Sequence, residues 1–242
     1  MPAPSPAADG SELFEYTLAH LGPRLRRLRS PRQLRDSLRW SADQLERAYA
    51  SAPAAARAAV ACREGCAACC HVPVDAQAHE VLFAADHLQL TFSPQALADA
   101  VDRLAAHRGR IAAFTDNQRD DSRQPCPLLQ AGSCSIYAGR PQPCRSHHTS
   151  DAAACDAHLE DPTVEITKVY IPPIRARMFS VMLGVDEAFE AAGYDERAYD
   201  FGSALHEALT NPCCLDDWLR QRSAFPDDCL TEPPARPAAD GP

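Results

Sequence analysis

The densest cluster of cysteines in this chain reads Cys62-Arg-Glu-Gly-Cys66-Ala-Ala-Cys69-Cys70, a C-x3-C-x2-C-C pattern. Two thiolates separated by two residues can reach one metal ion, and thiolates suit zinc, iron or an iron–sulfur cluster. Adjacent side chains of an extended segment point to opposite faces. We therefore expect Cys69 and Cys70 to serve two different metals, or one of them to pack while the other ligates.

A second set of cysteines follows 55 residues later and comprises Cys126, Cys134, Cys144 and Cys155. Their spacing matches no simple zinc finger, so alone it would be a weak signal. The two sets together supply eight cysteines, which is enough for two four-thiolate sites or for one cluster plus a mononuclear site. A metal bound by both sets would tie together distant parts of the chain.

The composition is that of an ordinary globular protein, with 242 residues of which 45% are hydrophobic and 24% charged. These proportions exclude disorder along the whole chain. A net charge of -9 argues against nucleic-acid binding by counterion release. Residues 1–10 contain no apolar core of a secretory signal, and no apolar run is long enough to span a membrane. We expect a cytoplasmic protein, whose clustered thiols stay reduced and bind metal.

Helix signals dominate the chain outside the cysteine segments. A capping residue followed by proline, a common helix start, occurs three times. These starts are at Ser30, Ser93 and Asn211. Six apolar residues between Ile174 and Phe189 recur at helical spacing, whereas β-branched residues concentrate only between Val164 and Ile171. We therefore predict a mainly α protein, a single helical domain wrapped around cysteine-rich, metal-stabilised loops, with little β-structure.

The same signals divide the chain into five predicted segments. Residues 1–10 and 225–242, which lack apolar periodicity, are expected to be mobile tails. Residues 11–60 are expected to form N-terminal helices, residues 61–160 the cysteine-cluster core, and residues 161–224 C-terminal helices packed on that core.

The order of the cysteine motifs resembles the YkgJ-type cysteine-cluster family, whose members are described as zinc- or iron-chelating proteins. The family pattern is a CxxxCxxCC or CxxCxxCC cluster, then a cysteine before Pro-Leu, a Cys-x-Ile-Tyr step, and Arg-Pro followed by a cysteine. The same elements stand in order here at Cys62–Cys70, Cys126–Leu129, Cys134–Tyr137 and Arg140–Arg145. The resemblance covers about residues 60–160. It implies a metal held by cysteines, without implying any particular reaction.

Carried over position by position, the resemblance also implies a set of ligands. These are Cys62, Cys66, Cys69, Cys70, Cys126, Cys134 and Cys144, with Cys155 added as an eighth. The implied metal is zinc or iron, and an iron–sulfur cluster is a further option.

Two interpretations fit each of several residues near the cysteines. Arg140 and Arg145 either stabilise the negative charge of thiolates or bridge loops. Three histidines either support the metal site or are ordinary polar residues. They are His71, His147 and His148. The last three cysteines are expected outside the site, Cys213 and Cys214 as a structural pair and Cys229 in the tail with no role.

Three functions fit these observations, and the chain lacks the motifs of nucleotide-binding proteins, zincins and serine hydrolases. The favoured function is a cytoplasmic metal-binding protein that holds zinc or iron, with its physiological process open. The second is an iron–sulfur or mononuclear-iron redox or modifying enzyme, so the question of catalysis stays open. The third is an interaction module folded by structural zinc, in which an arginine-rich helix face contacts a protein partner through residues such as Arg26, Arg29 and Arg35. Neither a nucleic acid nor a membrane is an expected partner.

Overall fold

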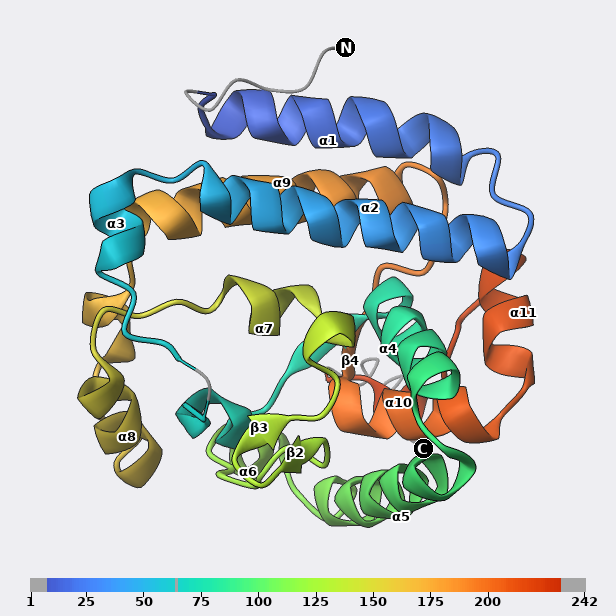
Figure 1. The fold of residues 1–242 in the computed structure, drawn as a ribbon. Helices are drawn as coiled ribbons and strands as arrows, with labels where there is room; N and C mark the ends of the chain where they lie inside the picture. Colours follow the sequence, from blue (N-terminus) through green and yellow to red (C-terminus); the bar gives the residue numbers. More distant parts are fainter. Residues whose placement is uncertain (1–7, 64, 232–242) are drawn as a thin grey trace, which may run out of the picture.

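The computed structural model describes residues 8–63 and 65–231, and helices dominate this part of the chain. Three long helices form one layer (Figure 1): α1 (Gly10–Leu25), α2 (Pro31–Ala50) and α9 (Pro172–Glu190). A second group of helices packs below this layer: α4 (Ala78–Thr91), α5 (Pro94–Ile111) and α10 (Phe201–Thr210). The predicted mainly α fold is confirmed. None of the helices described combines the length and apolar character that crossing a membrane requires.

Short elements connect the long helices. The short α-helices are α3 (Ala54–Ala58), α6 (Asp116–Asp120), α7 (Gln142–Ser146), α8 (Ala152–Glu160) and α11 (Cys213–Leu219). The 3-10 helices are η1 (Ala68–His71), η2 (Tyr137–Gly139), η3 (Ile166–Val169) and η4 (Asp227–Cys229). Two small antiparallel sheets pair β1 (Asp75–Gln77) with β4 (Ala198–Asp200), and β2 (Leu129–Gln130) with β3 (Ser133–Cys134). In the first sheet Ala76 lies opposite Tyr199.

The predicted helix starts are confirmed where a capping side chain supplies a local reason. The Ser30 hydroxyl accepts a hydrogen bond from the Gln33 amide at the start of α2. Ser93 caps α5 in the same way. The β-branched run 164–171 forms no strand in the described structure, because its centre winds into η3 and it makes only an isolated bridge through Tyr170.

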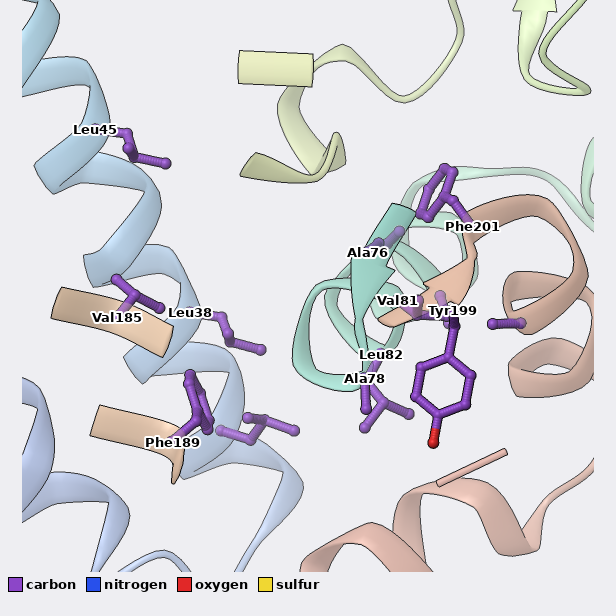
Figure 2. Close-up of a cluster of buried hydrophobic side chains, with 14 of the residues drawn as sticks. Leu38, Leu45, Ala76, Ala78, Val81, Leu82, Val185, Phe189, Tyr199 and Phe201 are labelled. Carbon is purple, nitrogen blue, oxygen red and sulfur yellow. The ribbon is translucent and has the colours of Figure 1, made fainter. Parts of the chain in front are cut away.

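The hydrophobic core lies between the two groups of helices (Figure 2). The upper layer contributes Leu38 and Leu45 from α2, and Val185 and Phe189 from α9. The residues that face them come from the first sheet and from α4 and α10. They are Ala76, Ala78, Val81, Leu82, Tyr199 and Phe201. The core thus joins the N-terminal and C-terminal helices to the segment that follows the first cysteine cluster.

Both predicted tails are too long. Asp9 caps α1 and Ala8 is buried, so the packed chain begins before residue 11. At the other end, Phe225 and Cys229 are buried and Leu230 bridges to Tyr199. Phe225 and Cys229 therefore belong to the core, contrary to the prediction, because a few apolar side chains suffice to anchor a segment that has no periodicity. The rest of the predicted tails, residues 1–7 and 232–242, lie outside the described residues.

Close packing of α1 against α9 depends on Gly184. A β-carbon at this position would lie 2.9 Å from the carbonyl oxygen of Phe14 and 2.9 Å from the β-carbon of Thr17. We expect Gly184→Ala to lower the free energy of unfolding by about 1–3 kcal/mol, because the backbone of α1 must shift. Urea unfolding followed by circular dichroism measures the change.

Gly109 provides the matched control for this substitution, because it lies exposed in α5 and a β-carbon there would meet nothing within 4 Å. Gly109→Ala is expected to raise the free energy of unfolding by about 0.5–1 kcal/mol through helix propensity. Equal effects of the two substitutions would contradict the packing argument.

A small group of buried titratable side chains lies where α4, α7 and α9 meet. The Glu80 carboxylate accepts hydrogen bonds from the backbone amides of Gln77 at 2.7 Å and Gln142 at 2.6 Å. The His79 ring stacks on Phe189 at 4.1 Å, and burial lowers its pKa to about 3, so the ring is neutral near pH 7. Burial raises the pKa of Glu80 to about 8 and that of Asp186 to about 6.

The raised pKa of Glu80 predicts a pH-dependent stability. A carboxyl group whose pKa is higher in the folded than in the unfolded chain stabilises the fold at low pH, and this contribution disappears as the pH rises to the folded value. We therefore expect the free energy of unfolding to fall between pH 6.5 and pH 8. This range lies above the pH values at which the protonation of His79 and Asp186 contributes to the stability. Urea unfolding measured across this range should show a smaller fall of the free energy of unfolding with pH for Glu80→Gln than for the unmodified protein. A slope identical to that of the unmodified protein would argue against this assignment.

Candidate metal centre

The two cysteine-bearing segments lie side by side and are joined by backbone hydrogen bonds. The Cys126 amide donates to the carbonyl oxygen of Cys70 at 2.7 Å. Next to the first cysteine, the Ala61 amide donates to the carbonyl oxygen of Thr149 at 2.8 Å. Residues more than 50 positions apart in the sequence are thereby held together by protein contacts alone.

The first thiol group consists of Cys62, Cys66 and Cys155, and its centre is Thr149. The Thr149 amide donates to the Cys62 sulfur at 3.4 Å, and the Thr149 hydroxyl lies 3.7 Å from that sulfur and 3.3 Å from the Cys155 sulfur. Burial, and then the neighbouring thiols of Cys62 and Cys69, raise the pKa of Cys66. No sequence motif points to Thr149, since it lies 87 residues from Cys62.

The second thiol group consists of Cys126, Cys134 and Cys144. Cys134 is held by the β2–β3 hairpin, where it pairs with Leu129, and Cys144 lies in α7. Burial is the main cause that raises the pKa of Cys126, to about 11, with a further contribution from Cys134. Burial likewise raises the pKa of Cys144, as do the thiols of Cys126, Cys69 and Cys134. These three thiols are therefore close enough to influence one another electrostatically.

The vicinal pair Cys69-Cys70 lies in η1, between the two thiol groups. A hydrogen bond with Cys70 is the largest cause that raises the pKa of Cys69, and burial adds to it. Cys69 in turn raises the pKa of thiols in both groups. Six of the predicted ligands thus form two groups of three thiols, and Cys69 lies close enough to both groups to act on thiols in each.

Arg140 and Arg145 act on the thiols and also hold the loop. The Arg140 guanidinium lowers the pKa of Cys69, Cys134 and Cys144, partly offsetting the effect of burial. Arg145 is buried, donates to the carbonyl oxygens of Arg140 at 2.9 Å and of Ala138, and forms an ion pair with Glu46 at 3.4 Å. The structure therefore supports both roles of these arginines, the stabilisation of thiolate charge and the bridging of loops.

The three histidines make contacts of their own. His147 meets the ring of Tyr170 edge-on at 5.4 Å, and His148 stacks on Tyr49 at 4.7 Å. The Nδ1 atom of His71 lies 3.0 Å from the carbonyl oxygen of Ala67. These contacts position all three rings beside the cysteine segments.

The remaining cysteines lie outside both thiol groups. Cys213 is exposed at the start of α11, and Cys214 is buried with its sulfur 3.7 Å from the carbonyl oxygen of Glu207. Cys229 is fully buried. The expectation that it has no role is corrected to a packing role in the core.

The thiols are not arranged in a complete metal coordination geometry. Within residues 8–63 and 65–231, no three Cys, His, Asp or Glu side chains already have the spacing that would hold a metal ion. The chemistry of the donor set nevertheless fits zinc or iron, because the gathered thiols raise one another's pKa and a cation would relieve that repulsion. Metal binding would then draw thiolates together and release protons.

Comparison with known proteins agrees with this donor set. Residues 61–168 match the CxxCxxCC family model, described as a "putative zinc- or iron-chelating domain". The matched segment contains all eight predicted ligands, and the match confirms the resemblance to a cysteine-cluster family that was inferred from the motifs. Searches of the curated proteins and of the solved structures gave no match.

Proposed function

We propose that this protein binds zinc or iron through the thiolates of its two thiol groups and of the vicinal pair between them. The full ligand set is Cys62, Cys66, Cys69, Cys70, Cys126, Cys134, Cys144 and Cys155. The observation that carries the proposal is the convergence of these eight cysteines from two distant segments, with mutual effects on their pKa values.

Each thiol group would take one member of the vicinal pair as its fourth ligand. This division would give each ion the four ligands of a tetrahedral thiolate site. Four thiolates around a divalent ion carry two net negative charges, which the guanidinium groups of Arg140 and Arg145 would offset. The Thr149 amide and hydroxyl, which contact the sulfurs of Cys62 and Cys155, would orient the first group.

We infer that the protein works in the reducing environment of the cytoplasm. All eleven cysteines are free, which suits a compartment in which thiols persist. The bound metal either stabilises the fold or is carried for delivery to another protein.

A second candidate function is an iron–sulfur or mononuclear-iron redox or modifying enzyme. The observation that favours it is a pocket of about 300 Å³ that is lined by Cys69 and Cys155, so that a small molecule could approach the centre.

Anaerobic purification without chelators, followed by elemental analysis and an absorbance spectrum, tests the proposal. We expect about two metal ions per chain if each thiol group holds one. Zinc gives a colourless protein, whereas iron bound by thiolates absorbs visible light. Far less than one ion per chain, unchanged after anaerobic reconstitution with zinc and with iron, would overturn the proposal.

A further inference from the structure

One face of α4 supports the segment that leads to the last cysteine of the second thiol group. Glu80 and His87 lie seven residues apart in α4, so two helical turns place them on the same face. Both contact the segment 139–142, which ends at the first residue of α7, two positions before Cys144. The helix itself is anchored by buried residues along its length. Coordination of a metal by cysteines does not by itself require such a support.

The contact at Glu80 fixes the backbone at the start of α7. One carboxylate oxygen accepts a hydrogen bond from the Gln142 amide at 2.6 Å, and the other accepts one from the Gln77 amide at 2.7 Å. Glu80 is only 6% exposed, so both bonds are shielded from water. A single carboxylate therefore joins the start of α4 to the start of α7, which lies 62 residues further along the chain.

The position of α7 depends on contacts of this kind. The helix has only five residues, and so short a helix is not stable by itself in water. The Gln142 side chain donates to Asp186 of α9 at 3.1 Å, and Arg145 forms an ion pair with Glu46 of α2. Of these contacts with three long helices, the one with Glu80 is made by the backbone of α7.

The contact at His87 is a close approach of the backbone to a side chain. Gly139 is buried, and a β-carbon there would lie 2.7 Å from both the β-carbon and the γ-carbon of His87. Only a glycine allows the segment to lie this close to α4. Gly139 and Gln142 thus bring the segment against α4 at two points that lie three residues apart.

We propose that Glu80 is a positioning residue for the second thiol group: through the Gln142 amide it holds α7 so that Cys144 stays beside Cys126 and Cys134. The inference rests on the proposed function, because its main consequence is a higher metal affinity of the second thiol group. The first thiol group belongs to other segments of the chain and should not depend on this contact.

Pulse alkylation by iodoacetamide tests the inference at single cysteines. The protein is equilibrated in buffers of increasing free zinc concentration, and peptide mass spectrometry gives the concentration at which each cysteine is half protected. For Glu80→Ala we expect the half-protecting concentration for Cys144 to rise about ten- to hundredfold, the loss that is typical when the support of a metal ligand is removed. The value for Cys62, in the first thiol group, should stay the same.

Two further variants complete the comparison. Leu21→Ala is the control for a general loss of stability, because Leu21 is fully buried in α1, which packs against α2 and α9. It should lower the melting temperature without changing the zinc concentration that protects either cysteine. Gly139→Ala should act like Glu80→Ala, since its β-carbon forces the segment away from His87. This variant tests the support even if Glu80→Ala does not fold.

The same alkylation without metal separates this inference from the proposed function. In the metal-free protein, Glu80→Ala should make Cys144 react about three- to tenfold faster, as the loss of one buried hydrogen bond predicts, and leave the rate at Cys62 unchanged. Unchanged behaviour of Cys144 in both Glu80→Ala and Gly139→Ala, or equal changes at Cys144 and Cys62, would overturn the inference. If zinc protects no cysteine of the unmodified protein, the proposed function fails, and the metal-free rates still decide whether Glu80 holds α7.

Discussion

Removal of the metal is expected to lower the melting temperature of this protein by roughly 10 °C. The segments that carry the cysteines contain little regular structure of their own, since η1, α7, β2 and β3 are all very short. A ligand present at about a thousand times its dissociation constant stabilises the folded state by roughly 4 kcal/mol. In a chain of this size, each kcal/mol shifts the melting temperature by about 2–4 °C.

Scanning calorimetry before and after dialysis against a chelator, without oxygen, measures this shift. The same segments are also joined by backbone hydrogen bonds between Cys126 and Cys70 and between Ala61 and Thr149, so we expect a destabilised but folded chain. Zinc or iron should restore the original melting temperature and magnesium should not, because magnesium binds oxygen ligands. Identical melting of the metal-loaded and metal-free protein would contradict a stabilising centre.

Substitution of Cys144 by serine is expected to remove about half of the bound metal, as the loss of one ligand from one of two four-thiolate sites predicts. Three neighbouring thiols influence Cys144, namely Cys126, Cys69 and Cys134. Its loss leaves the second thiol group with two cysteines and one member of the vicinal pair. Elemental analysis of the purified variant measures the effect.

Two further variants make this experiment decisive. Cys62→Ser should remove the metal of the first thiol group and spare the second. Cys213→Ser, which changes an exposed cysteine on α11, should leave the metal content unchanged. Unchanged metal content in Cys144→Ser would exclude Cys144 as a ligand. Complete loss of metal in both ligand variants would show one shared centre in place of two.

The sequence correctly predicts the helix starts that depend on contacts between near neighbours in the chain. Ser30 and Ser93 cap helices because their hydroxyl groups bond to amides three residues away, a relation that is readable in the sequence. Asp75 precedes α4 but does not cap it, because the N-cap of α4 is Gln77. Asp75 pairs with Arg119 and lies opposite Asp200 in the β1–β4 ladder.

Contacts between distant residues could not be predicted in this way. The predicted ligand cysteines follow from the order of their motifs, but the proximity of Cys62 to Cys155 depends on Thr149, which contacts both sulfurs only in the folded chain.

X-ray absorption spectroscopy of the metal-loaded protein tests the central claim most directly, because it reports the atoms bound to the metal. The account predicts a coordination shell of sulfur alone, at about 2.3 Å if the metal is zinc. A shell dominated by oxygen or nitrogen at about 2.0–2.2 Å would contradict binding by the cysteine groups.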